Sequence, residues 1–382
     1  MEQLKAYKFR IYPTEEQELF FAKSFGCVRK VYNLMLNDRM KAYEETKKNT
    51  SKKMKFPTPA KYKEEFPFLK EVDSLALANA QLNLDKAYKN FFRDKSVGFP
   101  RFKSKKNTVQ SYTTNNQKGT VALIENKFIK IPKLKSLVKI KLHRQPKGII
   151  KSATISRHSS GKYYISLLCK EEIVELPKTN SAIGIDLGIT DFAILSNGQK
   201  IDNNKFTSKM AKKLKREQRK LSKRALLAKK KGINLFEAKN YQKQKRKVAR
   251  LYEKVMNQRN DFLNKLSTEI IKNHAIICIE DLNTKGMLHN HKLAKSISDV
   301  SWSSFVTKLQ YKADWYGREI IKINKWFPSS QICSECGHKD GKKPLDIREW
   351  TCPICHAHHD RDINASINIL TEGLRLHSKG LA

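Results

Sequence analysis

The sequence has 382 residues, which is enough for two or three domains that each bury a hydrophobic core. Its 77 lysines and arginines stand against 37 acidic residues, and the net charge of +40 indicates a polyanionic partner rather than a merely soluble basic protein. The sequence has no apolar run as long as a membrane span and no signal-peptide pattern, so we expect an intracellular protein without a membrane partner.

The first hundred residues predict a strand followed by two helices. Residues 4–12 alternate between polar and apolar side chains, which is typical of a strand, and Thr14 with Gln17 forms a capping box for the next helix. After a lysine-rich loop with two prolines, we expect a second helix from about Ser74 to Phe92, with Leu82 on its buried face.

The segment from Phe99 to Lys106 mixes aromatic and basic side chains, a composition that suits contact with a nucleic-acid backbone. A solvated loop is an equally good interpretation of this segment by itself. The candidate nucleic-acid contacts in it are Arg101, Lys103 and Lys105.

Residues 109–174 change to a hydrophobic period of two, with Gly, Asn and Pro between short apolar segments. Several short strands of this kind predict a small β-barrel, and the first strand of the chain could complete it, which would make the two helices an insertion. Residues 175–179 then form a linker. The expected strands are Val121–Leu123, Phe128–Ile131, Val138–Leu142, Ile149–Ser156 and Tyr163–Cys169.

The stretch from Ile183 to Ile194 predicts a buried strand, a glycine turn and the start of a second strand. Asp186 lies where the first of these strands ends, and a carboxylate in that setting is costly unless a metal ion, a donor or water meets it. Gly188 leaves room for a backbone or a phosphate to approach closely.

Residues 205–250 are helical in pattern and carry 19 lysines and arginines but only two acidic residues, Glu217 and Glu237. This ratio leaves most of the charges without a partner along the helix, so we favour contact with nucleic acid over a plain solvated helix. Gly232 is expected to divide the segment into two helices, the second of which continues to about Ile270. The candidate contacts are Lys212, Lys213, Arg216, Arg219 and Arg259.

Two further acids occur in similar settings. Glu280 ends an apolar strand, and Asp362 begins a helix that we expect to pack through Ile363, Ile367 and Leu370. Because carboxylates that meet repel one another and oxygen ligands suit Mg²⁺ or Mn²⁺, we expect these two acids and Asp186 to bind two such ions about 4 Å apart.

Three structural acids are the alternative interpretation, since an acid at a strand end is often only a turn residue. Asp360 is a rival to Asp362. We prefer Asp362 because we place it at the N-cap of the helix, and we place Asp360 in the preceding turn.

Four of the seven cysteines form two CxxC pairs, Cys333 with Cys336 and Cys352 with Cys355, separated by 15 residues. This spacing predicts a closed, tetrahedral zinc site with a structural role. The other three cysteines stand alone in apolar surroundings, which favours buried thiols over disulfides. The histidines that could replace one cysteine ligand are His338, His356, His358 and His359.

These motifs together resemble TnpB, the OrfB-type protein of bacterial insertion sequences, which is similar to the ancestors of the type V CRISPR nucleases. The resemblance rests on Gly184–Gly188, Ile279–Asn283, the two cysteine pairs and Asp360–Ile369, in this order along the chain. Residues 7–13 and 99–103 also match, so the resemblance covers nearly the whole chain.

The resemblance implies a multidomain protein with α/β and β-barrel parts. An RNase H-like nuclease domain of the RuvC type would contain the zinc ribbon, and a wedge-like N-terminal barrel would be interrupted by a helical recognition domain. Asp186, Glu280 and Asp362 would be the catalytic metal ligands. The implied ranges are 1–12 for the first barrel strand, 13–106 for the recognition domain, 107–180 for the rest of the barrel, 181–330 and 358–382 for the nuclease domain, and 331–357 for the zinc ribbon.

The resemblance also implies a guide RNA from the transposon end and magnesium-dependent cutting of double-stranded target DNA beside a short target-adjacent motif. We expect such a protein in the cytoplasm of a bacterium or archaeon, near the nucleoid, as a monomer or a dimer on its RNA. Two alternatives stay open. One is an RNA-independent transposase or resolvase-like nuclease, and the other is a non-catalytic regulator that binds nucleic acid.

Overall fold

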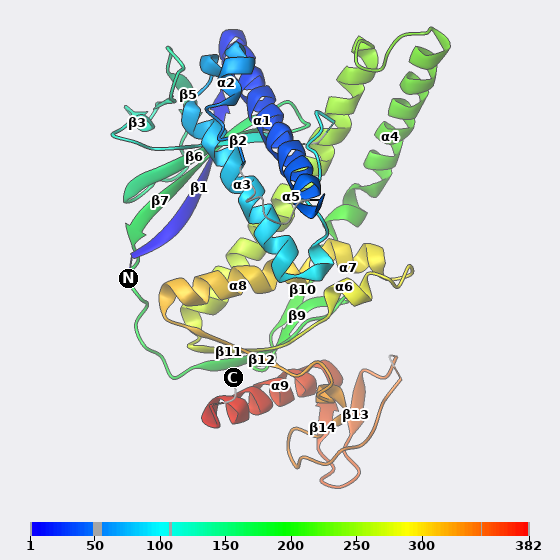
Figure 1. Cartoon of the computed structure of the whole chain (residues 1–382). Helices are drawn as coiled ribbons and strands as arrows, with labels where there is room; N and C mark the ends of the chain where they lie inside the picture. The colour runs from blue at the N-terminus through cyan, green and yellow to red at the C-terminus, as the bar shows by residue number, and fades with distance from the viewer. Residues whose placement is uncertain (1, 49–55, 107–108, 345, 381–382) are drawn as a thin grey trace. The chain divides into compact units, whose positions relative to one another are not determined.

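The computed structural model describes residues 2–48, 56–106, 109–344 and 346–380. The chain divides into two compact units, Glu2–Glu172 and the part from Ile173 onward, and each is described by itself (Figure 1). Among the described residues, no helix combines the length and the apolar composition that crossing a bilayer requires.

The N-terminal unit is built on a seven-stranded antiparallel sheet with the order β2-β6-β7-β1-β5-β4-β3. Strand β1 pairs with β7 on one side and with β5 on the other, so the first strand of the chain joins strands that follow much later in the sequence. The strands are β1 (Glu2–Tyr12), β2 (Gln110–Asn115), β3 (Ala122–Ile124), β4 (Phe128–Lys130), β5 (Val138–Lys141), β6 (Ile149–Arg157) and β7 (Tyr163–Glu172).

Among the described residues, the sheet has two unpaired edges, so the small barrel predicted from the sequence is not closed. Strands β2 and β3 form its two edges and do not pair with each other. β2 packs against helix α3 (Ser74–Arg93) instead, where Thr114 donates a hydrogen bond to Asp73 at the start of that helix. Strands β3 and β4 have only three residues each, so they offer few hydrogen bonds for closure.

The helices of this unit follow the predicted order. Helix α1 begins with the predicted capping box, in which the backbone N–H of Thr14 donates to Gln17 Oε1 at 3.1 Å and the backbone N–H of Gln17 donates to Thr14 Oγ1 at 3.4 Å. The expectation for Leu82 was wrong: this side chain is exposed, because it lies out of phase with the buried Leu77 and Leu84. The helices are α1 (Glu15–Lys48), α2 (Tyr62–Glu65) and α3, with short 3₁₀ turns at Pro67–Glu71 and Lys95–Val97.

One hydrophobic core joins the helices to the sheet. Phe9 of β1, Phe21 of α1, Leu77 of α3 and Tyr163 of β7 are all fully or almost fully buried in it. Burial of such side chains contributes about 1.5–3 kcal/mol each, so this contact holds the helical insertion on the sheet.

The C-terminal unit is built on a five-stranded mixed sheet with the order β10-β9-β8-β11-β12. Strands β8, β11 and β12 are parallel, whereas β9 and β10 form antiparallel pairs. The strands are β8 (Ala182–Asp186), β9 (Asp191–Leu195), β10 (Lys200–Asp202), β11 (Ile276–Glu280) and β12 (Glu319–Ile323).

Helices cover both faces of this sheet (Figure 1). Alternate residues of β11 point to opposite faces, so Cys278 packs with Ile369 of α9 while Ile277 packs with α5 and α8. A two-stranded sheet carries the cysteine region. The remaining elements are α4 (Phe206–Lys230), α5 (Lys239–Asn273), α6 (Thr284–Met287), α7 (Ala294–Val300), α8 (Trp302–Tyr316), a 3₁₀ turn at Ser329–Gln331, β13 (Glu349–Thr351), β14 (His358–Asp360) and α9 (Arg361–Ser378).

Helix α9 approaches strand β8 very closely at Gly184. A Cβ atom on Gly184 would lie 2.1 Å from the carbonyl oxygen of Ser366. The fully buried face of α9 accordingly carries Ala365, Ile369 and Gly373, whereas the three residues expected there, Ile363, Ile367 and Leu370, are only half-buried. Small side chains let the two backbones come close, which places the start of α9 beside the end of β8.

Gly184→Ala should lower the free energy of unfolding by about 1–3 kcal/mol, because the new Cβ atom would meet backbone that cannot move aside easily. Urea denaturation of the purified protein measures this change. Gly26→Ala is the control, because a Cβ atom at this position in α1 meets nothing within 4 Å, and this variant should be neutral or slightly stabilised. Equal destabilisation of both variants would contradict the close approach of α9.

Candidate functional site

Two of the predicted acids lie side by side at one edge of the C-terminal sheet. Asp186 ends β8 and Glu280 ends β11, and these parallel strands pair with Ile185 opposite Ile279. Parallel neighbours end at the same edge of a sheet, so the pairing brings the two carboxylates together. Both side chains are partly buried.

The acids influence one another electrostatically. Burial, together with the charges of Glu280 and Asp362, raises the pKa of Asp186 to about 7. Burial also raises the pKa of Glu280, although the hydrogen bond that Ser329 Oγ donates to Glu280 Oε1 at 2.7 Å opposes this shift. The site therefore favours a proton on Asp186 near neutral pH, and a cation bound between the acids would compete with that proton.

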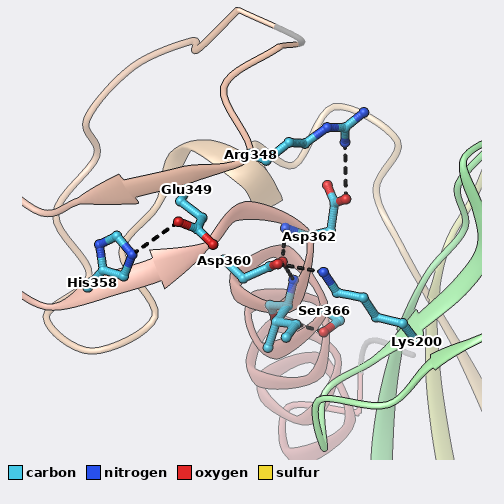
Figure 2. A network of polar contacts seen from close by, with 8 residues as sticks. Lys200, Arg348, Glu349, His358, Asp360, Asp362 and Ser366 are labelled. Carbon is cyan, nitrogen blue, oxygen red and sulfur yellow. Dashed lines mark hydrogen bonds and ion pairs between the residues drawn. The ribbon is translucent and has the colours of Figure 1, made fainter.

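Asp362 lies in the first turn of α9 and not at its N-cap, which corrects the placement expected from the sequence. The N-cap is Asp360, whose Oδ1 accepts the backbone N–H groups of Asp362 and Ile363 at 3.1 and 3.0 Å (Figure 2). The reason is that strand β14 continues through Asp360, which keeps its backbone in the extended conformation that a cap requires. The Asp362 carboxylate instead accepts a hydrogen bond from Arg348 Nη1, with a distance of 3.1 Å between the two atoms.

Asp360 is also engaged by an ion pair with Lys200 Nζ at 2.5 Å (Figure 2). Burial alone would raise the pKa of Asp360, but Lys200 and the backbone N–H groups of the first helical turn lower it. Asp360 thus anchors the start of α9, whereas the charge of Asp362 reaches Asp186. This division of contacts favours Asp362 over its rival as the third acid.

The three acids are less tightly grouped than the cysteines. Among the described residues, the four cysteines form a group whose ligand atoms lie close enough to hold a metal ion, and the three acids do not form such a group. The ion pair between Arg348 and Asp362 occupies one of these carboxylates.

Two asparagines of α9 hold the segment that leads into the cysteines. Asn364 Nδ2 and Asn368 Nδ2 both donate to the carbonyl oxygen of Ile332 at 2.7 Å, and Asn368 Nδ2 also donates to that of Ser329 at 2.8 Å. Ser329 in turn donates to Glu280. The helix that carries the third acid is thereby connected to Glu280 through Ser329.

The four sulfur atoms of Cys333, Cys336, Cys352 and Cys355 all lie within 4.8 Å of one another, so these residues could hold a metal ion. The Sγ atoms of Cys333 and Cys355 are 3.6 Å apart and those of Cys336 and Cys352 are 3.7 Å apart, which is too far for a disulfide bond of about 2.05 Å. The close sulfurs shift one another's pKa in opposite directions: the backbone N–H of Cys355 and the neighbouring thiols lower the pKa of Cys352, whereas neighbouring sulfurs raise the pKa of Cys336 and Cys355.

Tight turns hold both cysteine pairs in place. The backbone N–H of Gly337 donates to the carbonyl oxygen of Cys333, and that of His356 donates to that of Cys352. Among the histidines considered as replacement ligands, His359 reaches the group, with its Nε2 atom 3.1 Å from Cys333 Sγ. His359 therefore contacts the sulfur group without being one of its four cysteines.

Helix α4 carries a basic strip on one side. Lys212, Arg216 and Arg219, three of the predicted contacts, line a surface hollow, and Lys213 is exposed on the same helix. Spacings of three and four residues keep the members of the strip on one face. The members are Lys212, Lys215, Arg216, Arg219, Lys220 and Lys223.

Arg259 is placed differently from the other predicted contacts. Its Nη2 atom forms an ion pair with the buried Asp299 and donates to Thr207 Oγ1 at 2.9 Å. Asp299 also accepts the backbone N–H of Thr207. These bonds tie α5 to the start of α4 and to α7, so Arg259 has a structural contact that the sequence did not indicate.

The predicted contacts of the N-terminal unit differ in exposure. Arg101 and Lys105 are exposed, whereas Lys103 is half-buried with its Nζ atom 4.0 Å from the centre of the Tyr32 ring. Burial lowers the pKa of Lys103. The backbone of Lys103 exchanges two hydrogen bonds with the side chain of Asn33, so this residue also fastens the loop to α1.

Three residues that contact the acids at the start of α9 and at the sheet edge were not predicted from the sequence. Ser329 belongs to a Phe-Pro-Ser-Ser segment before the first cysteine, which is a local signal but one without an assigned role. Arg348 and Lys200 contact acids that are 14 and 160 positions away in the chain. No local pattern indicates such pairs.

Three family models match parts of the chain. An OrfB-type model described as "Probable transposase" matches residues 166–291, and a model described as "Cas12f1-like, TNB domain" matches residues 302–369. A third model, described as "Helix-turn-helix domain", matches residues 1–48, where the described residues form strand β1 and the single continuous helix α1.

Curated relatives are similar over nearly their whole length. A protein of Streptomyces pristinaespiralis named "Putative RNA-guided DNA endonuclease" is 40% identical over 385 residues, which cover 100% of this chain and 92% of the relative. An Escherichia coli K12 protein named "Putative RNA-guided DNA endonuclease InsQ" is 32% identical over 391 residues, which cover 98% of this chain and 93% of the relative.

A solved structure is similar in fold. A chain in the cryo-EM structure of a Cas12f1–sgRNA–target DNA complex has a TM-score of 0.56 and 15% identity, with 96% of this chain and 98% of that chain covered. On the identity and the extent of the matches with its curated relatives, the chain belongs to the TnpB family of OrfB-type insertion-sequence proteins.

Proposed function

We propose that this chain is a transposon-associated, RNA-guided DNA endonuclease that hydrolyses phosphodiester bonds of target DNA beside a short target-adjacent motif. The observation that carries the proposal is the pairing of β8 with β11, which brings the partly buried Asp186 and Glu280 together within reach of the charge of Asp362. The names of the nearly full-length relatives support the RNA-guided activity.

The donor set fits Mg²⁺ or Mn²⁺, because Asp186, Glu280 and Asp362 offer only carboxylate oxygens. Two such ions, when bound by these acids, would supply the positive charge for activating a water and for stabilising a leaving 3′ oxygen. The chain itself sets the geometry of the acids. Ser329 orients Glu280, and the hydrogen bonds that Asp360 accepts fix the helical turn from which Asp362 projects.

We assign zinc to the four cysteines, because four thiolates at this mutual distance suit a tetrahedral ion with no position left for water. The ribbon, residues 331–357, would then be structural. It lies in the chain between Ser329, which contacts Glu280, and Asp362, so its folding fixes two parts of the acid site.

The basic strip of α4 is proposed to contact phosphates of the guide RNA or the target DNA. Its six cations are exposed on one helix face, where they can neutralise successive phosphates. The ranges given from the sequence remain our proposed domain boundaries. The RNase H-like nuclease domain would be the mixed sheet of the C-terminal unit with the helices on its two faces.

Expressed together with the DNA of its transposon end, the wild-type chain should carry co-purifying RNA and should cut matching double-stranded DNA in Mg²⁺. Asp186→Ala, Glu280→Ala and Asp362→Asn should each slow cutting by about 10³-fold or more and leave binding of the guide RNA nearly unchanged. Asp360→Asn is the matched control and should keep most of the cutting activity, because asparagine also caps helices well. Gel assays of cutting and filter binding of RNA give both quantities.

Other outcomes would correct the proposal in specific ways. If the Asp362→Asn protein cuts DNA and the Asp360→Asn protein does not, the third acid is Asp360 and not Asp362. Cutting by a protein without bound RNA would favour the RNA-independent transposase. A wild-type chain that binds nucleic acid and does not cut it in Mg²⁺ or Mn²⁺ would favour the non-catalytic regulator.

Without added divalent cations, Asp186 should make the protein less stable as the pH rises from about 4 to about 7. The pKa of Asp186 is about 7 in the folded chain and near 3.8 in the unfolded chain. Between these two values the folded chain binds more protons than the unfolded chain, so each rise in pH lowers the free energy of unfolding. Asp186→Asn should flatten this part of the profile and raise Tm at pH 8. Thermal unfolding followed by circular dichroism measures both profiles, and parallel profiles would contradict the prediction.

Cys352→Ser should lower both the zinc content and Tm, because the loss of one thiolate opens a closed site. Elemental analysis and thermal unfolding measure the two effects. Cys27→Ser is the control, since this buried thiol of α1 lies outside the group and its loss should leave the zinc content unchanged. A Cys352→Ser protein with full zinc content and wild-type Tm would argue against the ribbon.

A further inference from the structure

The turn after β12 presents an exposed tryptophan. Trp326 is 80% exposed, whereas Trp302 and Trp350 are buried and Trp315 is half-buried. Its neighbour Phe327 packs into the core between α9 and the sheet. The same turn therefore packs one aromatic ring partly into the core and leaves the other in solvent, although burial of an indole ring is strongly favourable.

The turn holds the indole in a defined place. Asn324 Oδ1 accepts the backbone N–H of Trp326 at 2.9 Å, and the carbonyl oxygen of Asn324 accepts the backbone N–H of Phe327 at 2.9 Å. These bonds fix the backbone on both sides of the tryptophan. Lys325 Nζ lies 5.1 Å from the centre of the indole ring, so a cation accompanies the aromatic surface.

The turn lies at the edge of the sheet where the acids meet. Ile323, the last residue of β12, pairs with Glu280 in parallel register. Ser329, three residues after Trp326, donates to Glu280 Oε1 at 2.7 Å. Three residues of extended chain span at most about 11 Å, so the Cα atom of Trp326 lies no farther than that from the Cα atom of Ser329.

A cavity of about 240 Å³ lies beside Glu280, and a hollow that shares part of its lining reaches Lys325 of this turn. Glu280, Lys322 and Trp302 line the cavity, and Lys325 lines the hollow. Trp302 is itself buried, and its ring forms part of the cavity wall. The cavity and the hollow share Asp281, Leu282 and Thr284.

We propose that Trp326 stacks on an unpaired nucleobase of the DNA strand that is cut, next to the scissile phosphate, with Lys325 beside the backbone of that nucleotide. The inference rests on the proposed function. An aromatic ring stacks on any base, so this contact positions the strand without reading its sequence. Sequence discrimination is then left to base pairing with the guide. The strand must be single-stranded here, because a paired and stacked base offers no open face.

Abasic scanning of the cut strand tests the contact. In single-turnover cutting by RNA-loaded wild-type protein, an abasic nucleotide at one or two positions near the cut should slow the reaction by roughly 5- to 150-fold, the range of one base stack. Trp326→Ala should cut the intact strand more slowly by a similar factor and should no longer respond to those positions. Trp326→Phe should retain most of the wild-type rate and the wild-type response.

Phe236→Ala is the matched control, because this aromatic residue is 73% exposed on the connection between α4 and α5. It should cut at the wild-type rate with the wild-type abasic profile. A Trp326→Ala protein that keeps the wild-type abasic profile, whether fast or slow, would overturn the stacking contact, since a purely structural role changes the rate without changing the profile.

A binding measurement separates this inference from the proposed function. In Asp186→Ala protein, a single-stranded oligonucleotide with 2-aminopurine at the sensitive position should lose fluorescence on binding, because stacking quenches this base. Adding Trp326→Ala should restore the fluorescence, and persistent quenching would overturn the contact. If the wild-type chain cuts no DNA and the quenching still depends on Trp326, the nuclease proposal fails and the stacking contact stands.

Discussion

The electrostatic cost of gathering carboxylates at one sheet edge is the constraint on which the C-terminal unit depends. Backbone pairing between β8 and β11 forces Asp186 and Glu280 together, and Asp362 adds a third charge. Mutual repulsion and burial would favour separation or protonation, as the raised pKa of Asp186 shows. The hydroxyl of Ser329 and the guanidinium of Arg348 offset part of this cost by contacting Glu280 and Asp362. The strand pairing and the helix that carry the acids keep the three carboxylates in place.

Helix α9 is the element that this arrangement positions most tightly. Gly184 lets the helix backbone approach β8 in a way that any side chain at this position would prevent. Asn364 and Asn368 then fasten the segment before the cysteines to the side of the same helix. Because these contacts involve backbone atoms and short side chains, they leave few alternative arrangements, and small displacements of the third acid would require several bonds to break together.

Features that depend on sequence neighbours could be predicted, and features that depend on distant partners could not. The capping box of Thr14 and the acid ends of two apolar strands follow from local pattern, because caps and buried strands have local signatures. Strand β2 was missed since its residues are mostly polar, and the cap at Asp360 was misplaced because it depends on β14, which forms only within the cysteine region. Likewise, the partner of Arg259 lies forty residues away, so a charge that the composition assigned to nucleic acid serves the packing of helices.

The attachment of the cysteine region to α9 has a consequence for how the chain can change. The N-terminal end of the cysteine region is held at Ile332 by hydrogen bonds from two asparagines of α9. Its C-terminal end runs directly into the same helix. A loop whose ends are already fixed near each other tolerates added length cheaply, at about 0.6 kcal/mol for each doubling. Gly341, between the two knuckles, has open space around it. Lineages could therefore lengthen or replace this outer tip, and an engineer could insert a further domain there, while the positions of the three acids stay unchanged.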